Sequence, residues 1–199
     1  MVTELELKAV VPDPVTLRMR LLAVGATRRF GGAMTDRRYD RAGELVARDE
    51  VLRLRSFPGS EQGGHAVLGW KGPSRVSRDG YKQREEIELP IGSGRGEPAA
   101  FLAALGYRVV HTIDRWIEVF ELADTTLRLE SYPQMDDLLE VEGEPAAIER
   151  AIAATGIARK EFTAESLTAF ARRYESRSGR PALLAAGDRP MRPPAWASA

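Results

Sequence analysis

The sequence has no cysteine and only two histidines among its 199 residues. Disulfide bonds and thiolate-bound metals are therefore excluded, and a metal site made of several histidines is not expected. Carboxylates are then the side chains that remain to hold a metal ion. Because carboxylate oxygens are hard ligands, any bound metal should be a hard cation such as Mg²⁺ or Mn²⁺.

An excess of one charge is also missing, since 29 basic residues balance 29 acidic ones. A chain that binds nucleic acid usually carries a basic excess, so we expect no nucleic-acid partner. No apolar run approaches the ~20 residues of a membrane span, and the first residues lack the basic and apolar regions of a signal peptide. These absences predict a cytoplasmic protein that does not associate with membranes.

About eight segments of the chain read as extended, and the connections between them are mostly short. The expected strands lie near 2–11, 33–40, 51–57, 65–71, 82–91, 107–121, 125–132 and 137–143, with short helices expected after Pro14, Pro98 and Pro145 and over 163–174. Short connections favour antiparallel order. This many antiparallel strands form either a closed barrel or a sandwich.

Residues 176–199 differ in composition from the rest of the chain. Arg, Pro, Gly, Ala and Ser dominate there, and no hydrophobic periodicity is present. Such a composition is typical of a disordered or loosely packed tail. We therefore place one folded domain at residues 1–175 and the tail at 176–199.

The first expected strand alternates charged and apolar side chains with a period of two. Glu4, Glu6 and Lys8 fall on one face of an extended backbone, and Leu5 and Leu7 fall on the other. Later strands repeat this pattern with both charge signs. Seven carboxylates and eight cations share such faces: Glu4, Glu6, Glu86, Glu88, Glu130, Glu140 and Glu142, with Lys8, Arg53, Arg55, Lys71, Lys82, Arg84, Arg115 and Arg128.

Two structures explain this alternation. In the first, the charged face of each strand is solvated, as in any antiparallel sheet with one wet face. In the second, the sheet closes into a barrel and the charged faces point inward, because one face of every barrel strand faces the lumen. A lumen with both charge signs suits a polyanion together with divalent cations, since arginine and lysine bind phosphate oxygens and glutamates bind Mg²⁺.

The order of the motifs favours the second structure. Glu4-Leu5-Glu6-Leu7-Lys8 is followed by Leu52-Arg53-Leu54-Arg55, Trp70-Lys71-Gly72-Pro73, Arg84-Glu85-Glu86-Ile87-Glu88 and Glu140-Val141-Glu142. Over residues 1–175 this series resembles the CYTH superfamily, which is named for class IV adenylyl cyclases and thiamine triphosphatases. The resemblance implies an α+β fold in which eight antiparallel strands close into a barrel, the triphosphate tunnel, with flanking helices. It also implies an enzyme that acts on triphosphates with a divalent metal, and a homodimer as one assembly.

By the same resemblance, each charged position has an expected role. Glu4, Glu6, Glu130, Glu140 and Glu142 would be metal ligands. Lys8, Arg53, Arg55, Lys71, Arg84 and Arg115 would bind the phosphates, and Glu86, Glu88 and Lys82 would support them. Catalysis would centre on the N-terminal motif, with Glu4, Glu6 and Lys8.

Two positions depart from the family pattern. Where members carry K-x-R, this chain has Ile113 before Arg115, so one phosphate-binding cation is missing unless Lys82 or Arg108 replaces it. Where members carry an aspartate on the next strand, this chain has Glu130, whose extra methylene shifts the ligand geometry. Both changes bear on the reaction and the substrate more than on the fold.

Three functions fit this resemblance. The favoured one is a triphosphatase, in which water attacks the terminal phosphorus of an inorganic or organic triphosphate or polyphosphate. The second is an adenylyl cyclase that converts ATP into cyclic AMP and pyrophosphate, and the third is a non-catalytic module that binds nucleotide or polyphosphate. Hydrolysis is favoured because it needs no adenine pocket, and none is recognisable in the sequence.

Overall fold

The computed structural model describes residues 2–58, 65–92 and 97–198. The strands are β1 (Val2–Val10), β2 (Thr27–Asp40), β3 (Val51–Phe57), β4 (His65–Lys71), β5 (Arg75–Val76), β6 (Lys82–Ile91), β7 (Arg108–Leu122), β8 (Thr125–Ser131) and β9 (Leu138–Gly143). The helices are α1 (Pro14–Ala23), α2 (Pro98–Ala104), α3 (Pro145–Thr155) and α4 (Leu167–Ser178), with short 3-10 helices η1 (Val46–Arg48), η2 (Arg159–Glu161) and η3 (Ala195–Ser198). No helix in the described part of the chain is long and apolar enough to cross a membrane.

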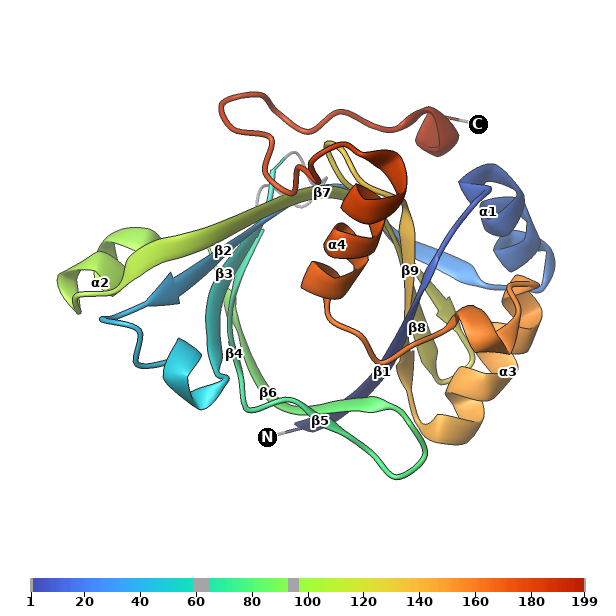
Figure 1. The fold of residues 1–199 in the computed structure, drawn as a ribbon, viewed down its shortest axis with the longest axis horizontal. Helices are drawn as coiled ribbons and strands as arrows, with labels where there is room; N and C mark the ends of the chain where they lie inside the picture. The colour runs from blue at the N-terminus through green and yellow to red at the C-terminus, as the bar shows by residue number, and fades with distance from the viewer. Residues whose placement is uncertain (1, 59–64, 93–96, 199) are drawn as a thin grey trace.

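The strands form one closed antiparallel barrel. Their order around it is β1-β9-β8-β7-β2-β3-β4-β6, and the pairing of β6 with β1 closes the ring. The short strand β5 lies outside the ring and pairs with β6. Figure 1 looks along the barrel, with the helices around its wall and across its opening. The predicted α+β fold with an eight-stranded barrel is confirmed, and the sandwich is excluded.

The pair β2 and β7 is the longest in the barrel. The sequence predicted a strand that begins near residue 33, after Gly31-Gly32. The strand instead begins at Thr27, because β7 is long enough to pair with it over its whole length, and Gly31 faces Glu118 across the pair. The two glycines therefore lie within a strand, and the tertiary pairing overrides their local preference.

The apolar face of β1 packs against two helices outside the barrel. Leu7 belongs to a buried cluster that also contains Leu17 and Leu21 of α1 and Ile148 of α3. Helix α1 begins as the sequence predicts, since Asp13 Oδ1 accepts a hydrogen bond from the Thr16 N–H at 3.0 Å. Because Leu7 faces outward, the charged residues that alternate with it along β1, Glu6 and Lys8, must face the lumen.

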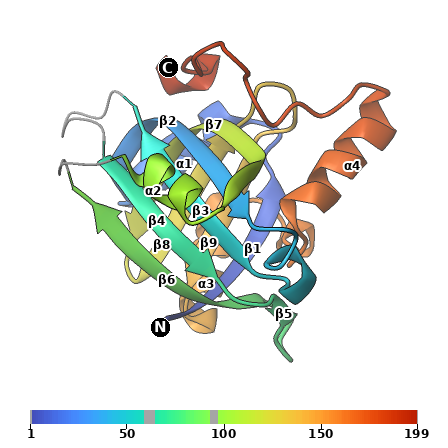
Figure 2. The same ribbon diagram turned by 90° about the vertical axis from the view of Figure 1, so that its left-hand side faces the viewer.

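Helix α2 lies on the outer face of the barrel, and helix α4 lies at one of its ends. Leu102 of α2 packs with Tyr39 and Leu54 on the outer face of β2 and β3. Helix α4 does not lie along the wall, and Figures 1 and 2 together place it across one end of the barrel. Phe170 of α4 is buried in a cluster with Ile113. Helix α4 thus covers one mouth of the lumen.

The C-terminal segment contacts the barrel at several points. Leu183 pairs with Gln134 through two backbone hydrogen bonds, and Ala186 N–H donates to Asp114 Oδ2 at 2.8 Å. Trp196 is buried among the residues that pack against α1, and its Nε1 donates to Asp137 Oδ2 at 3.0 Å. Helix α4 itself continues to Ser178, beyond the boundary expected at 175. The division of the chain into a domain and a tail stays a prediction.

Candidate active site

Ion pairs between strands that are not neighbours show that the charged faces line the lumen. Lys71 on β4 pairs with Glu4 on β1, although β6 runs between these strands. Arg53 Nη2 on β3 lies 3.0 Å from Glu88 Oε1 on β6, although β4 runs between them. Such contacts span an intervening strand only on the concave inner face. The predicted site residues therefore come together inside the barrel.

One side of the lumen is built from β1, β9 and their neighbours. Lys8 Nζ donates to Glu6 Oε1 at 2.9 Å and also pairs with Glu140. Glu6 is paired in turn with Lys82, and Glu140 with Arg128. All five of these side chains therefore belong to one network that joins β1, β6, β8 and β9. The free-energy cost of burying each charge is offset by ion pairs with partners of the opposite sign.

The opposite side of the lumen is rich in arginine. Arg53 and Arg55 on β3 both pair with Glu88, whose side chain is 41% exposed at the edge of the lumen. Glu88 therefore lies nearer to solvent than the other predicted carboxylates. Gly69 on β4 leaves room for the Arg53 side chain, because a Cβ on residue 69 would lie only 3.3 Å from Arg53 Nε.

Arg115 and Glu130 meet on β7 and β8. Arg115 Nη1 lies 3.0 Å from Glu130 Oε1, and Tyr132 O–H donates to Glu130 Oε2 at 2.5 Å. Burial and the charge of Glu130 raise the pKa of Tyr132, so its hydroxyl stays protonated and keeps donating. Both Glu130 oxygens are thus engaged within the wall, and the longer side chain is accommodated by Arg115 and Tyr132.

Three further carboxyl groups lie close together. Glu86 and Glu142 each share a hydrogen bond with Glu4. Burial, followed by the interaction with Glu4, raises the pKa of Glu86 to about 7 and that of Glu142 to about 9. Burial opposes ionisation of Glu4 as well, but the bond with Glu86 and the charge of Lys71 outweigh it and lower the pKa of Glu4. Glu4 is therefore the ionised member of this cluster.

The donor set of this cluster fits a hard divalent cation. Its ligands are carboxylate oxygens, and burial together with the charge of Glu4 disfavours ionisation of Glu86 and Glu142. A divalent cation would supply positive charge there. In the described residues, no three acidic or histidine side chains are already arranged as a metal site, since Lys and Arg pair with most of the carboxylates. Metal binding by Glu4, Glu6, Glu130, Glu140 and Glu142 stays a prediction.

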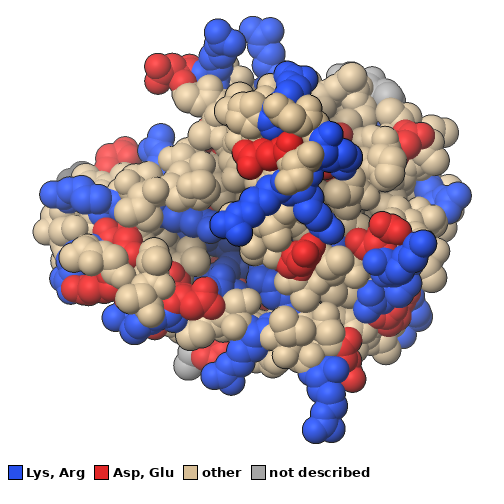
Figure 3. All heavy atoms as spheres, viewed as in Figure 1, with Lys and Arg blue, Asp and Glu red and all other residues tan. Residues whose placement is uncertain are grey.

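A cavity of about 240 Å³ lies in the lumen beneath the start of α4. Eight Lys or Arg side chains line it, but only four Asp or Glu side chains. Figure 3 shows this mouth as a hollow in the surface beside α4, with Lys and Arg atoms lining it. The positive excess is local, because the whole chain has a formal net charge of zero. Such a cavity attracts anions.

Three charged residues that line this cavity were not predicted from the sequence: Asp36, Arg38 and Asp49. Asp36 on β2 is fully buried, 3.6 Å from Arg115 and 3.9 Å from Arg53, and neither of its oxygens has a hydrogen-bond partner among the described residues. Arg38, two residues on, makes none of the ion pairs or hydrogen bonds found in the described part of the chain. The alternation was hidden here because Asp36, Arg37 and Arg38 are all charged, and Arg37 faces outward.

The structure also resolves the departure at Ile113. Ile113 lies on the same face of β7 as Arg115 and is buried with Phe170 of α4. Lys82 lines the cavity, as one of the two expected replacements would, but it is paired with Glu6. Arg108 does not reach it, because its Nη1 donates to the Ala103 and Tyr107 carbonyl oxygens. At the position where the resemblance implies a cation, this chain has an apolar contact with α4.

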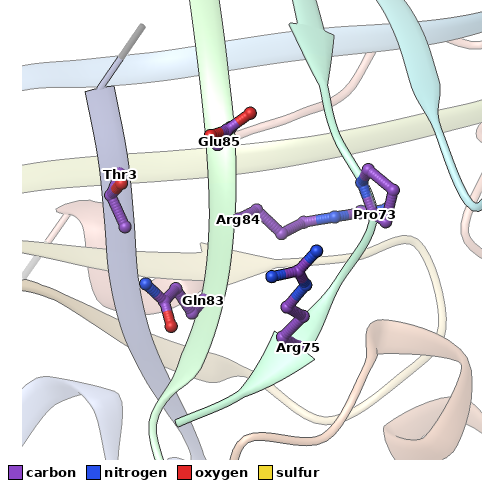
Figure 4. Close-up of a pocket in the computed structure, with 6 residues that line it drawn as sticks. All are labelled: Thr3, Pro73, Arg75, Gln83, Arg84 and Glu85. Atoms are coloured by element: carbon purple, nitrogen blue, oxygen red, sulfur yellow. The ribbon is translucent and has the colours of Figure 1, made fainter.

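Arg84 is held at the edge of the site. Figure 4 shows its side chain extending from β6 toward Pro73, beside a pocket of about 140 Å³ on the outer surface. Its Nε donates to Gly72 O at 2.7 Å, and its Nη2 donates to Asp49 O at 2.6 Å. Arg84 also lines the central cavity. It therefore fixes the connection after β4 as well as contributing charge.

Solved structures with the same fold are found across archaea, bacteria and plants. A Pyrococcus horikoshii protein is 21% identical, with a TM-score of 0.65 over 89% of this chain and 99% of its own. A candidate adenylate cyclase from Vibrio parahaemolyticus is 17% identical, with a TM-score of 0.67 over 84% of this chain and 96% of its own. A candidate adenylyl cyclase from Hippeastrum, described as having a dominant triphosphatase activity, is 17% identical, with a TM-score of 0.60 over 92% of this chain and 99% of its own.

At these identities the similarity shows a shared fold alone. No protein-family model matches the chain, and no curated protein matches its sequence. The shared fold is the closed barrel implied by the resemblance to the CYTH superfamily, and that part of the sequence prediction is confirmed. Activity rests on the site itself.

Proposed function

We propose that the chain is a CYTH-type triphosphatase that hydrolyses the terminal phosphate of an inorganic or organic triphosphate inside the barrel. The observation that carries this proposal is the central cavity, with its eight cationic and four anionic lining side chains. Phosphoryl transfer relies mainly on positioning and on neutralising the charge of the phosphate oxygens. An enclosed cavity with a cationic excess provides both.

The residues divide into two groups in this proposal. Lys8, Arg53 and Arg115 bind phosphate oxygens, and their present carboxylate partners hold them in place. Glu4, with its neighbours Glu86 and Glu142, holds Mg²⁺ or Mn²⁺. The metal, when bound, supplies positive charge to the phosphate oxygens. A carboxylate orients a water molecule for attack on the terminal phosphorus, the bond to the bridging oxygen breaks, and the shortened phosphate chain leaves.

The size of the cavity favours hydrolysis of a phosphate chain. Pockets that hold drug-sized ligands usually measure ~300–1,000 Å³. The cavity here measures about 240 Å³ and is lined mainly by charged side chains. It suits a chain of phosphates better than a whole nucleotide, whose base needs apolar or aromatic walls. Tripolyphosphate is therefore the substrate that we expect to be turned over.

An adenylyl cyclase is the second candidate. The candidate cyclases from Vibrio and Hippeastrum share the fold. The stretches Trp70–Pro73 and Lys82–Glu86 also resemble the cyclase branch of the superfamily. In that reaction the ribose 3′-hydroxyl attacks the α-phosphorus of ATP and pyrophosphate leaves. The same cationic side chains serve both reactions, so the products must distinguish them.

The test is a substrate panel with product identification. Purified protein is incubated with tripolyphosphate, ATP or thiamine triphosphate, each with Mg²⁺ or Mn²⁺. Glu4→Gln, which removes the ionised carboxylate proposed to hold the metal, serves as the inactive variant, and Glu121→Gln, at an exposed ion pair with Arg29, serves as the matched control. Release of orthophosphate without cyclic AMP supports the triphosphatase. Cyclic AMP and pyrophosphate from ATP would establish the cyclase instead, and binding without turnover would establish a non-catalytic module.

A further inference from the structure

The first turn of α4 faces the central cavity. Ser166, Leu167 and Thr168 all line the cavity, at the mouth that α4 covers. The first N–H groups of any helix lack partners within the helix. In α4, Ser166 accepts hydrogen bonds from the N–H groups of Ala169 and Phe170. The N–H groups of Leu167 and Thr168 take part in no hydrogen bond found among the described residues.

The cavity opposite this turn holds cationic side chains whose hydrogen bonds are incomplete. Arg53 and Arg115 are 7% and 6% exposed and form ion pairs with Glu88 and Glu130, but the Nε of each lacks a hydrogen-bond partner among the described residues. Arg38 lines the same cavity with its guanidinium unpaired, as described above. Buried donors that lack partners are costly, so they point to an acceptor that completes the site. An anionic acceptor would also balance the charge of the cavity, which is lined by eight cationic and four anionic side chains.

We propose that the first turn of α4 is a phosphate-binding element of this cavity. The N–H groups of Leu167 and Thr168, together with the Arg38 guanidinium, bind one end of the phosphate chain. A helix N-terminus favours anions, because its free N–H groups and its dipole point at the ligand. The inference rests on the proposed function, since it assigns two elements to the same site.

Two contacts fix α4 in the position that this role requires. Lys8 and Thr163 exchange backbone hydrogen bonds of 2.9 and 2.8 Å, which ties the segment before α4 to β1. Phe170, one turn into the helix, is buried with Ile113. The residue that replaces the family's lysine therefore seats a helix whose N-terminus supplies positive character in its place. Arg38 and the N-terminus of α4 thus supply the positive charge that a lysine at residue 113 would have supplied.

A single substitution can remove one of these donors without breaking the helix. Leu167 is the first residue of α4, where proline is well tolerated because its missing N–H has no partner in the helix. Ser166 has φ −74° and ψ 159°, the extended conformation that a residue before proline prefers. Leu167→Pro therefore deletes the N–H, and Leu167→Ala is the matched control that shortens the side chain but keeps the N–H.

The first measurement is the Kd of inorganic tripolyphosphate, by calorimetry in the presence of Mg²⁺. We expect Leu167→Pro to bind about tenfold more weakly than Leu167→Ala, as for loss of a hydrogen bond to a charged group. Arg38→Gln should weaken binding to a similar extent. Equal Kd values for the proline and alanine variants, with tight binding by the wild type, would overturn the inference and leave the proposed function standing. No binding by the wild type would overturn the proposed function itself.

A second measurement does not depend on how the variants fold. The amide proton resonances of Leu167 and Thr168 in the wild-type protein are followed by NMR as tripolyphosphate is added. Both should move downfield on binding, and the Ala169 amide, which already donates to Ser166, should move less. Binding with unchanged resonances at Leu167 and Thr168 would overturn the inference.

Discussion

Lys71 Nζ on β4 lies 2.8 Å from Glu4 Oε2 on β1, with β6 running between the two strands. Lys71 also pairs with Glu86 of that intervening strand. One lysine thus joins three strands across the inner face of the barrel. The charges that alternate along the sequence are therefore neighbours in the lumen, where a ligand must compete with them for partners.

The two ends of the carboxylate network should respond to neutralisation in opposite ways. Burial raises the pKa of Glu6, but the charge of Lys8 and that of Lys82 outweigh burial and lower it, despite Glu140 nearby. Glu6→Gln should therefore lower the free energy of unfolding at pH 7 by about 3 kcal/mol, since it removes the ion pair of Lys82 and one of the two ion pairs of Lys8.

Glu142 is the matched comparison. Burial and the charge of Glu4 raise its pKa to about 9, so it is mostly protonated at pH 7. Glutamine imitates that state, and Glu142→Gln should raise the melting temperature by a few degrees in metal-free buffer. Thermal unfolding of both variants checks this. Equal destabilisation of the two would mean that their environments are not as different as the structure shows.

The stability of the metal-free protein should fall as the pH rises, and Mg²⁺ should oppose this fall. The folded protein holds the pKa of Glu86 at about 7 and that of Glu142 at about 9, above the ordinary value of 4.5. Their contribution to stability is therefore complete below pH 4.5 and is lost as pH rises through 7 and 9. A cation requires the ionised carboxylates, so the increase in melting temperature caused by Mg²⁺ should grow over the same range.

Melting temperatures at pH 6, 7.5 and 9, each with EDTA or with Mg²⁺, test this dependence. Ca²⁺-free buffers are needed, because Ca²⁺ also binds carboxylate oxygens. A Mg²⁺ effect that is absent, or that is largest at pH 6, would contradict the placement of a metal near Glu4, Glu86 and Glu142.

Much of this fold followed from the sequence because the period-two alternation is a physical constraint. Leu5 and Leu7 pack in an apolar cluster that includes residues of the outer helices α1 and α3, so Glu4 and Glu6 point inward. What could not be predicted depends on pairing over long distances. The start of β2 at Thr27 is set by the length of β7, whereas the local glycines suggest a turn.

The site was predicted incompletely for a similar reason. Arg38 is preceded by Asp36 and Arg37, so charge alone does not show which residues face inward. Its register opposite Arg53 and His111 decides this, and register is not visible in one sequence. The place of α4 over the lumen likewise involves Ile113, which packs with Phe170, and this long-range contact is not visible in the sequence.

Gly69 tests whether the position of Arg53 matters for anion binding. A Cβ at Gly69 would lie 3.3 Å from Arg53 Nε and 3.4 Å from its Cγ, so Gly69→Ala should displace the guanidinium. We expect several-fold weaker binding of tripolyphosphate with little change in stability. Gly92→Ala is the control, because a Cβ there would meet no atom within 4 Å. Titration calorimetry on both variants gives the comparison, and unchanged binding by Gly69→Ala would remove Arg53 from the phosphate site.

Restoring the family's lysine should harm this protein. Ile113 is 1% exposed and packs with Phe170 in a buried cluster, so Ile113→Lys removes an apolar contact and buries a charge, with Asp36 opposite it across β2 and β7. The free energy of unfolding should fall by about 3 kcal/mol or more, whereas Ile113→Val should cost only ~1 kcal/mol. Urea unfolding followed by circular dichroism measures both. Wild-type stability combined with higher activity in Ile113→Lys would show that the cluster leaves room for the cation.

The most direct test of the proposed activity is ³¹P NMR of tripolyphosphate incubated with the protein and Mg²⁺. Hydrolysis of the terminal phosphate predicts that orthophosphate and pyrophosphate appear together in equal amounts with the wild-type protein. Neither should appear with Glu4→Gln, and both should appear with the Glu121→Gln control. A spectrum in which tripolyphosphate is unchanged by the wild type, or is hydrolysed equally by Glu4→Gln, would contradict the account.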